Sequence, residues 1–122
     1  MIYVERCIGK GRGVLARRKI GRGELIERAP IVVFTREEWE LIDKTVLTDY
    51  CFNWGDKQGA LALGYGSLYN HSYSPNARYR ENLPEMAIDF IALRDIEAGE
   101  EITVNYNGAP GDRTPVWFNA VD

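Results

Sequence analysis

The sequence is poor in the residues that bind metals and form disulfide bridges. Its 122 residues contain two cysteines, Cys7 and Cys51, and a single histidine, His71. Two cysteines do not make the disulfide framework of a small secreted domain. Together with one histidine they are too few for a structural zinc site, which takes four Cys or His ligands. We therefore expect neither a disulfide scaffold nor a metal centre.

Long hydrophobic runs and an excess of positive charge are also missing. No apolar run approaches the ~20 residues that span a bilayer, and residues 1–6 lack the apolar region of a signal peptide. We therefore predict a cytoplasmic protein without membrane contact. The net charge of −3 and the pI of about 5.2 argue against direct binding of nucleic acid, which usually requires a basic patch. They are compatible with a basic protein tail as partner.

Short alternating segments separated by glycine, proline and asparagine make up most of the chain. The chain is predicted to be a single, mostly β domain over residues 1–122. One short helix is predicted to begin after Thr35, because Thr35 and Glu38 form the pattern of a capping box. Pro30 indicates a strand break or a sheet edge. The predicted strands are residues 1–8, 14–16, 25–30, 31–34, 49–54, 76–82 and 86–93. Of these, 86–93 is expected to be a central strand of a sheet.

The polar segment 67–76 stands out from this background. It holds the only histidine, followed by Pro75 and Asn76, and it comes directly after the apolar, glycine-containing run 60–66. Such a density of Ser, Asn and Pro predicts a sharply turned loop with many local hydrogen bonds. By itself the pattern is equally typical of a polar turn around one structural histidine.

A second unusual segment is the glycine-rich stretch Gly9-Lys10-Gly11-Arg12-Gly13. It lacks the Gly-Lys-Ser/Thr ending of a phosphate loop and the spacing of a dinucleotide-binding turn. Glycine allows the backbone to approach a ligand closely. The pattern alone is consistent with a flexible hairpin as well.

Three motifs, in this order, resemble the signatures of SET-domain protein-lysine methyltransferases. They are G-x-G-V-L-A at residues 11–16, N-H-S-x-x-P-N at 70–76 and G-E-E-I-T-x-x-Y at 99–106. The resemblance covers roughly residues 1–118 and is closest to minimal, stand-alone bacterial or viral members. It implies the β-clip fold of small curved sheets, in which segment 101–106 passes through the loop around 67–76 as a pseudoknot. The core would be about 1–107, followed by a short aromatic tail, 108–122, without the zinc-binding segment of many members.

The implied activity is S-adenosylmethionine-dependent N-methylation of a lysine in a protein substrate, for example in a basic tail. This displacement needs no metal but requires a neutral, aligned amine. A buried aromatic channel favours the neutral lysine and tolerates methylammonium groups. Two alternatives are a catalytically idle SET-like peptide-binding module and an oligomeric β-clip protein without a cofactor site. A homodimer is one way for so short a domain to complete its substrate groove. The substrate and the number of methyl groups added stay open.

The resemblance also implies roles for individual residues. Tyr106 is the expected catalytic residue, and because a phenol has a pKa near 10, we assign it orientation of the amine rather than general-base catalysis. The expected cofactor-binding residues are Lys10, Gly11, Arg12, Gly13, Tyr50, Asn70, His71, Tyr106 and Trp117. The expected substrate channel consists of Tyr50, Trp54, Tyr106 and Phe118.

The chain departs from the family pattern at four positions, one of which is Asn105, where many members have Asp. Ser67 and Leu68 stand where members often have Arg-Phe, so a contact made by that arginine is lost. Val104 stands two residues before Tyr106, where an aromatic side chain often influences the number of methyl groups transferred.

Overall fold

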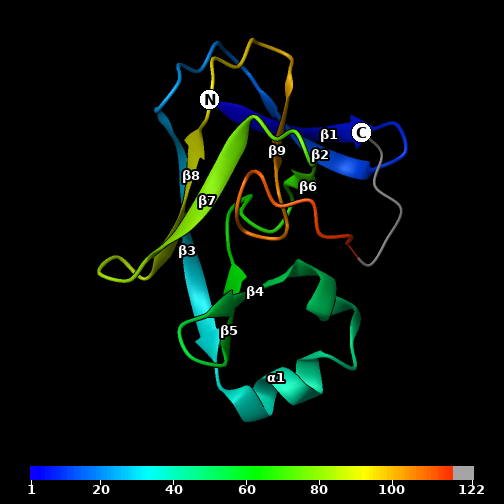
Figure 1. Ribbon diagram of the computed structural model, residues 1–122, viewed down its shortest axis with the longest axis vertical. Coiled ribbons are helices and arrows are strands. Elements are labelled where there is room, and N and C mark those ends of the chain that lie inside the picture. Colours follow the sequence, from blue (N-terminus) through cyan, green and yellow to red (C-terminus); the bar gives the residue numbers. More distant parts are fainter. Residues whose placement is uncertain (117–122) are drawn as a thin grey trace.

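The computed structural model describes residues 1–116 and is built mainly of short strands (Figure 1). The predicted mostly β fold with one short α-helix is confirmed. The elements are β1 (Ile2–Cys7), β2 (Gly11–Ala16), β3 (Leu25–Phe34), α1 (Arg36–Ile42), the 3-10 helix η1 (Val46–Tyr50), β4 (Cys51–Trp54), β5 (Gln58–Ala62), β6 (Asn70–His71), β7 (Ala77–Asn82), β8 (Ala87–Ala92) and β9 (Glu101–Val104). No helix within residues 1–116 is long and apolar enough to cross a bilayer.

Two sheets form the molecule. One has the strand order β1-β2-β9-β6 and the other β4-β5-β3-β8-β7. The β1–β2 hairpin lies at the opposite end of the molecule from α1, which sits beside the β4–β5 hairpin (Figure 1). As predicted, β8 is central, because it pairs with β3 on one side and β7 on the other.

The long strand β3 links the two parts of the second sheet. Its residues up to Pro30 pair with β8, and its residues from Ile31 to Phe34 pair with β5. The predicted break at Pro30 is therefore a change of partner within one continuous strand, not an interruption. Proline has no backbone N–H to donate to a ladder, so a position where one pairing ends and another begins accommodates it.

The start of α1 agrees with the predicted capping box. Thr35 Oγ1 accepts a hydrogen bond from the Glu38 backbone N–H at 3.1 Å, and Glu38 Oε1 accepts one from the Thr35 N–H at 2.8 Å. The predicted strand at 49–54 is partly wrong. Tyr50 ends η1, whose N-cap Thr45 accepts from the Leu47 N–H, and β4 begins only at the next residue.

The hydrophobic core includes side chains from both sheets. Its largest fully buried apolar members are Phe90, Ile20, Ile88, Ile96, Ile102, Val14 and Val104. Each such side chain contributes roughly 1.5–3 kcal/mol relative to exposure. Because β9 supplies Ile102 and Val104, the core fixes the strand that leads to Tyr106.

The segment before Tyr106 is held against the polar loop around residues 67–76, as the pseudoknot prediction requires. Strand β6 of the loop pairs in parallel with β9, Asn70 opposite Thr103 and His71 opposite Val104. At the end of the loop, Asn76 is 2% exposed and bonds to β9 twice. Its Oδ1 accepts from the Thr103 N–H at 2.9 Å and its Nδ2 donates to the Glu101 carbonyl at 2.7 Å.

Candidate active site

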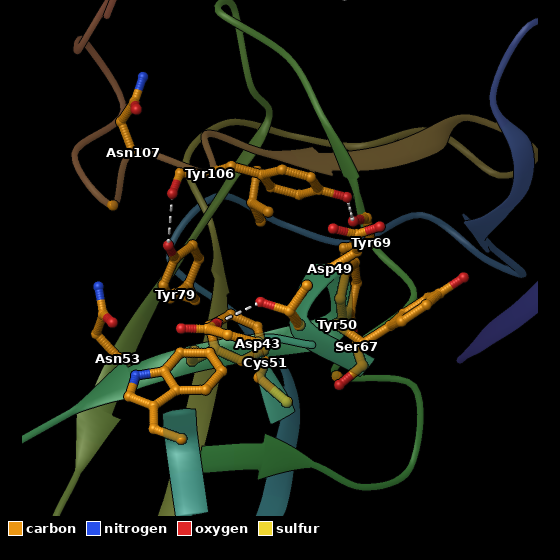
Figure 2. A pocket seen from close by; sticks show the side chains of 16 residues that line it. Asp43, Asp49, Tyr50, Cys51, Asn53, Ser67, Tyr69, Tyr79, Tyr106 and Asn107 are labelled. Carbon is orange, nitrogen blue, oxygen red and sulfur yellow. Dashed lines mark hydrogen bonds between the residues drawn. The ribbon is translucent and has the colours of Figure 1, made fainter. Parts of the chain in front are cut away.

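Two clefts lie beside the three motif segments and share four lining residues, Asp49, Tyr50, Ser67 and Tyr106. The larger cleft has a volume of about 660 Å³ and is called the aromatic cleft (Figure 2). Its polar lining includes Asp43, Asp49 and Ser67. Its aromatic lining residues are Trp39, Tyr50, Phe52, Tyr69, Tyr79 and Tyr106. The smaller, about 460 Å³, is called the basic cleft; it is lined by Lys10, Gly11, Arg12, Asp49, Tyr50, Ser67, Leu68, Asn70 and Tyr106.

Tyr106 is fixed at the junction of the two clefts by three hydrogen bonds. Its hydroxyl donates to the Tyr69 carbonyl at 2.6 Å, and its backbone carbonyl accepts from the Tyr79 hydroxyl at 3.3 Å, as Figure 2 shows. Its backbone N–H donates to His71 Nδ1 at 3.0 Å. The ring and the hydroxyl therefore have a defined position between the clefts.

The environment of Tyr106 keeps its hydroxyl protonated. Burial first, and then the proximity of Glu101, Tyr79 and Tyr50, raise the pKa of Tyr106 to about 12. A phenol with that pKa is neutral at physiological pH and does not act as a strong base. Because the hydroxyl uses its hydrogen in the bond to the Tyr69 carbonyl, it meets a bound amine as a hydrogen-bond acceptor.

His71 is buried, at 3% exposure, and lines neither cleft. Its ring packs edge-on against Tyr73 with centroids 4.4 Å apart, and Nδ1 accepts from the Tyr106 backbone. The imidazole therefore makes a positioning contact with the backbone of Tyr106, and the role of His71 in cofactor binding stays a prediction. The contact follows from the parallel pairing of β6 with β9, which points the side chain toward the end of β9.

The glycine-rich turn lies at the basic cleft, where Lys10, Gly11 and Arg12 form part of the lining. Gly11 has a φ of 74°, in the left-handed region. Gly13 does not line the cleft, but a Cβ at this position would lie 2.5 Å from Cys7 Sγ and 2.6 Å from Glu101 Oε2. Gly13 thus leaves room for the side chains packed behind the cleft.

Of the predicted channel residues, Tyr50 lines both clefts, at the end of η1. The prediction for Trp54 is wrong, because Trp54 is 4% exposed, belongs to the hydrophobic core and lines neither cleft. It pairs with Gln58 at the hairpin end of β4. Trp117 and Phe118 lie outside the described residues.

Sequence reasoning missed four aromatic residues of the aromatic cleft, which are Trp39, Phe52, Tyr69 and Tyr79. Trp39 is an aromatic residue on the otherwise strongly charged first turns of α1, a signal that could have marked it. Tyr79 comes from β7, where alternation of side chains gave no reason to separate it from the solvent-facing residues. Only the fold brings all four to the same cavity.

Comparisons with known proteins agree with the three motifs. The family model described as "SET domain" matches residues 11–107. A histone-lysine N-methyltransferase of Schizosaccharomyces pombe, named as specific for H3 lysine-37, is 36% identical over 110 residues, covering 89% of this chain and 71% of the yeast protein. The N-lysine methyltransferase KMT5A-A of Xenopus laevis is 31% identical over 132 residues, covering 92% of this chain but 36% of the frog protein.

A solved structure is similar in its three-dimensional arrangement as well. It is the crystal structure of a Plasmodium falciparum protein assigned as a histone methyltransferase, with a TM-score of 0.69 and 27% sequence identity. The superposition covers 89% of this chain and 99% of that one.

Proposed function

The chain belongs to the SET-domain family of lysine methyltransferases, and we propose that it transfers a methyl group from S-adenosylmethionine to a lysine side chain of a protein. One observation carries this proposal. Two clefts of different chemistry, one basic and glycine-lined and the other aromatic, share Tyr106, Tyr50, Asp49 and Ser67 in their linings. A donor and an acceptor bound in separate clefts would face each other at these shared residues.

The basic cleft is the proposed site of S-adenosylmethionine. Its volume of about 460 Å³ lies within the range of small-molecule sites. Lys10 and Arg12 supply positive charge for a carboxylate, and Gly11 allows close approach of the backbone to a ligand. When bound, the cofactor supplies a methyl group on a sulfonium, which an amine can displace.

The aromatic cleft suits the lysine. Its rings provide faces that tolerate ammonium and methylammonium groups, while their apolar surface disfavours the charged form of an inserted amine and lowers its pKa. The Tyr106 oxygen accepts an N–H of the amine and so directs the nitrogen lone pair. The proton that the amine loses leaves to solvent, because the Tyr106 hydroxyl is already protonated.

The proposed substrate is a basic protein segment with an exposed lysine. The carboxylates of Asp43 and Asp49 line the aromatic cleft, and the chain carries a net charge of −3, so a positively charged segment is attracted to this side. The Schizosaccharomyces pombe relative, which is named as a histone-lysine N-methyltransferase, makes a histone-like tail the first substrate to try.

The test compares wild type with Tyr106→Phe, and Tyr65→Phe serves as the control for loss of a tyrosine hydroxyl outside the clefts. Calorimetry measures binding of S-adenosylmethionine, and a labelled methyl group detects transfer to histone and to cell lysate proteins. We expect both proteins to bind with Kd values within about threefold, and Tyr106→Phe to transfer at least about 100-fold more slowly. Absence of cofactor binding by wild type would leave the idle peptide-binding module as the better description.

A further inference from the structure

The side chain of Glu101 lies behind the basic cleft and contacts two residues that line it. Its Oε1 is 3.3 Å from Lys10 Nζ, and its Oε2 accepts a hydrogen bond from Asn70 Nδ2 at 2.7 Å. The three residues come from the β1–β2 turn, β6 and β9. The sheet order β2-β9-β6 is what brings them together.

A carboxylate is the group that this position requires. Two donors, an ammonium and an amide NH2, converge on the two oxygens of one side chain, and an ionised carboxylate accepts through both. A glutamine has the same shape but only one accepting oxygen, so its own NH2 would face either Lys10 or Asn70. The side chains of Lys10 and Glu101 are only 17% and 21% exposed, which weakens solvent screening of the pair.

The contacts also fix which way the amide of Asn70 points. Nδ2 donates to Glu101 Oε2 and to the Arg12 carbonyl, both at 2.7 Å. Since both partners are acceptors, the nitrogen must face them, and both of its hydrogens are used. The Oδ1 atom is left to accept a hydrogen bond from a molecule in the cleft.

Lys10 is held in a similar way. Its ammonium has three hydrogens, and one contact to Glu101 leaves others for a bound anion. A lysine side chain in a turn normally samples many rotamers, and ordering it has an entropic cost when a ligand binds. Glu101 imposes that order in advance.

We propose that Glu101 is a positioning residue of the cofactor cleft, which holds the Lys10 ammonium and the Asn70 amide oxygen for the zwitterionic amino-acid end of S-adenosylmethionine. Lys10 takes the carboxylate of that end and Asn70 Oδ1 its ammonium. The inference rests on the proposed function. Gly13 supports it independently, because a side chain there would collide with both Glu101 Oε2 and Asn70 Nδ2, at 2.6 and 2.9 Å from its Cβ.

The experiment measures the Kd of two ligands by calorimetry, with competition for the weaker one. S-adenosylmethionine carries the amino-acid end, and 5′-methylthioadenosine lacks it. The variants are Glu101→Gln, Lys10→Met and the combination of the two. Glu97→Gln is the matched control, because it makes the same substitution at an exposed carboxylate of the turn before β9. Lys10→Met removes the other partner of the Lys10–Glu101 pair at a turn position. It therefore tests this pair even if Glu101→Gln does not fold.

We expect each single variant to raise the Kd for S-adenosylmethionine about tenfold or more, while the Kd for 5′-methylthioadenosine changes less than about threefold. The combined variant should weaken binding by less than the product of the two factors, because the residues act through one contact. The control should bind as wild type does.

Two results would overturn this role while leaving the proposed function in place. One is a Glu101→Gln variant that binds S-adenosylmethionine within about twofold of wild type. The other is an equal loss of affinity for both ligands, which a purely structural role would produce. A wild-type protein that binds no S-adenosylmethionine would overturn the inference and the proposed function together.

Discussion

The hydroxyl of Tyr106 donates a 2.6 Å hydrogen bond to the backbone carbonyl of Tyr69. Tyr69 is itself held at its other end, where its own hydroxyl donates to Glu27 Oε1 at 2.8 Å. Its ring stacks on Phe90 with centroids 4.2 Å apart. The residue whose carbonyl accepts the Tyr106 hydrogen bond is therefore held by β3 and by the core. The position of the Tyr106 hydroxyl thus depends on Glu27 and Phe90, which line neither cleft.

This relationship makes Glu27 a residue whose change should slow methyl transfer from a distance. Its carboxylate accepts from the Tyr69 hydroxyl and, at 2.9 Å, from the Tyr65 backbone N–H, and a glutamine can accept only one of these bonds. We expect Glu27→Gln to lower kcat about tenfold, since small displacements of a reacting group have large effects, with the Kd for S-adenosylmethionine nearly unchanged. Glu40→Gln on the exposed side of α1 is the control, and equal kcat values for the two variants would contradict the prediction.

Asn76 is predicted to be important for stability rather than for binding. Its replacement by alanine removes the bonds to the buried Thr103 N–H and to the partly buried Glu101 carbonyl and leaves both backbone groups without these partners. We expect Asn76→Ala to lower the free energy of unfolding by about 2–4 kcal/mol. Urea denaturation measures this, with the exposed Asn53→Ala as control; similar midpoints for the two variants would show that the pseudoknot does not depend on Asn76.

Gly13 should tolerate no side chain. An added Cβ falls within 2.6 Å of Cys7 Sγ and Glu101 Oε2, closer than atoms pack, so Gly13→Ala must move the group behind the basic cleft. We expect the Kd for S-adenosylmethionine to rise at least about tenfold. Gly21→Ala is the matched control, because the nearest atom to its Cβ is 4.0 Å away. Equal affinities of the two variants would mean that the cluster can shift without affecting the cleft.

Stability at high pH should depend on Tyr106. Burial raises the pKa of Tyr106 to about 12, whereas an unfolded tyrosine titrates near 10. Its contribution to stability is therefore complete below about pH 10 and is lost as the pH rises from about 10 to about 12. Burial also raises the pKa values of Tyr69 and Tyr79. Both wild type and Tyr106→Phe should therefore lose stability in alkali.

The measurement is urea denaturation at about pH 9 and about pH 11.5. The free energy of unfolding of Tyr106→Phe should fall less between these values than that of wild type, by up to about 2 kcal/mol. Parallel losses in the two proteins would show that the environment of Tyr106 does not hold its proton more tightly than water does.

The sequence alone determined the features that depend on local patterns. The capping box at Thr35, the central strand at 87–92 and the three family motifs were all readable from neighbouring residues, because caps, strand alternation and tight turns are set by short-range geometry. The mostly β fold followed from the number and length of these segments.

Tertiary structure decided how the pieces face one another. Which tryptophan reaches the aromatic cleft, Trp39 rather than Trp54, depends on how α1 and the β4–β5 hairpin pack. The direction of His71 and the contact between Glu101 and Lys10 depend on β9 lying between β2 and β6. Pairing between strands so distant in the chain leaves no periodic signal in any single segment, since it is stabilised by long-range packing and hydrogen bonds that form only when the whole domain has folded.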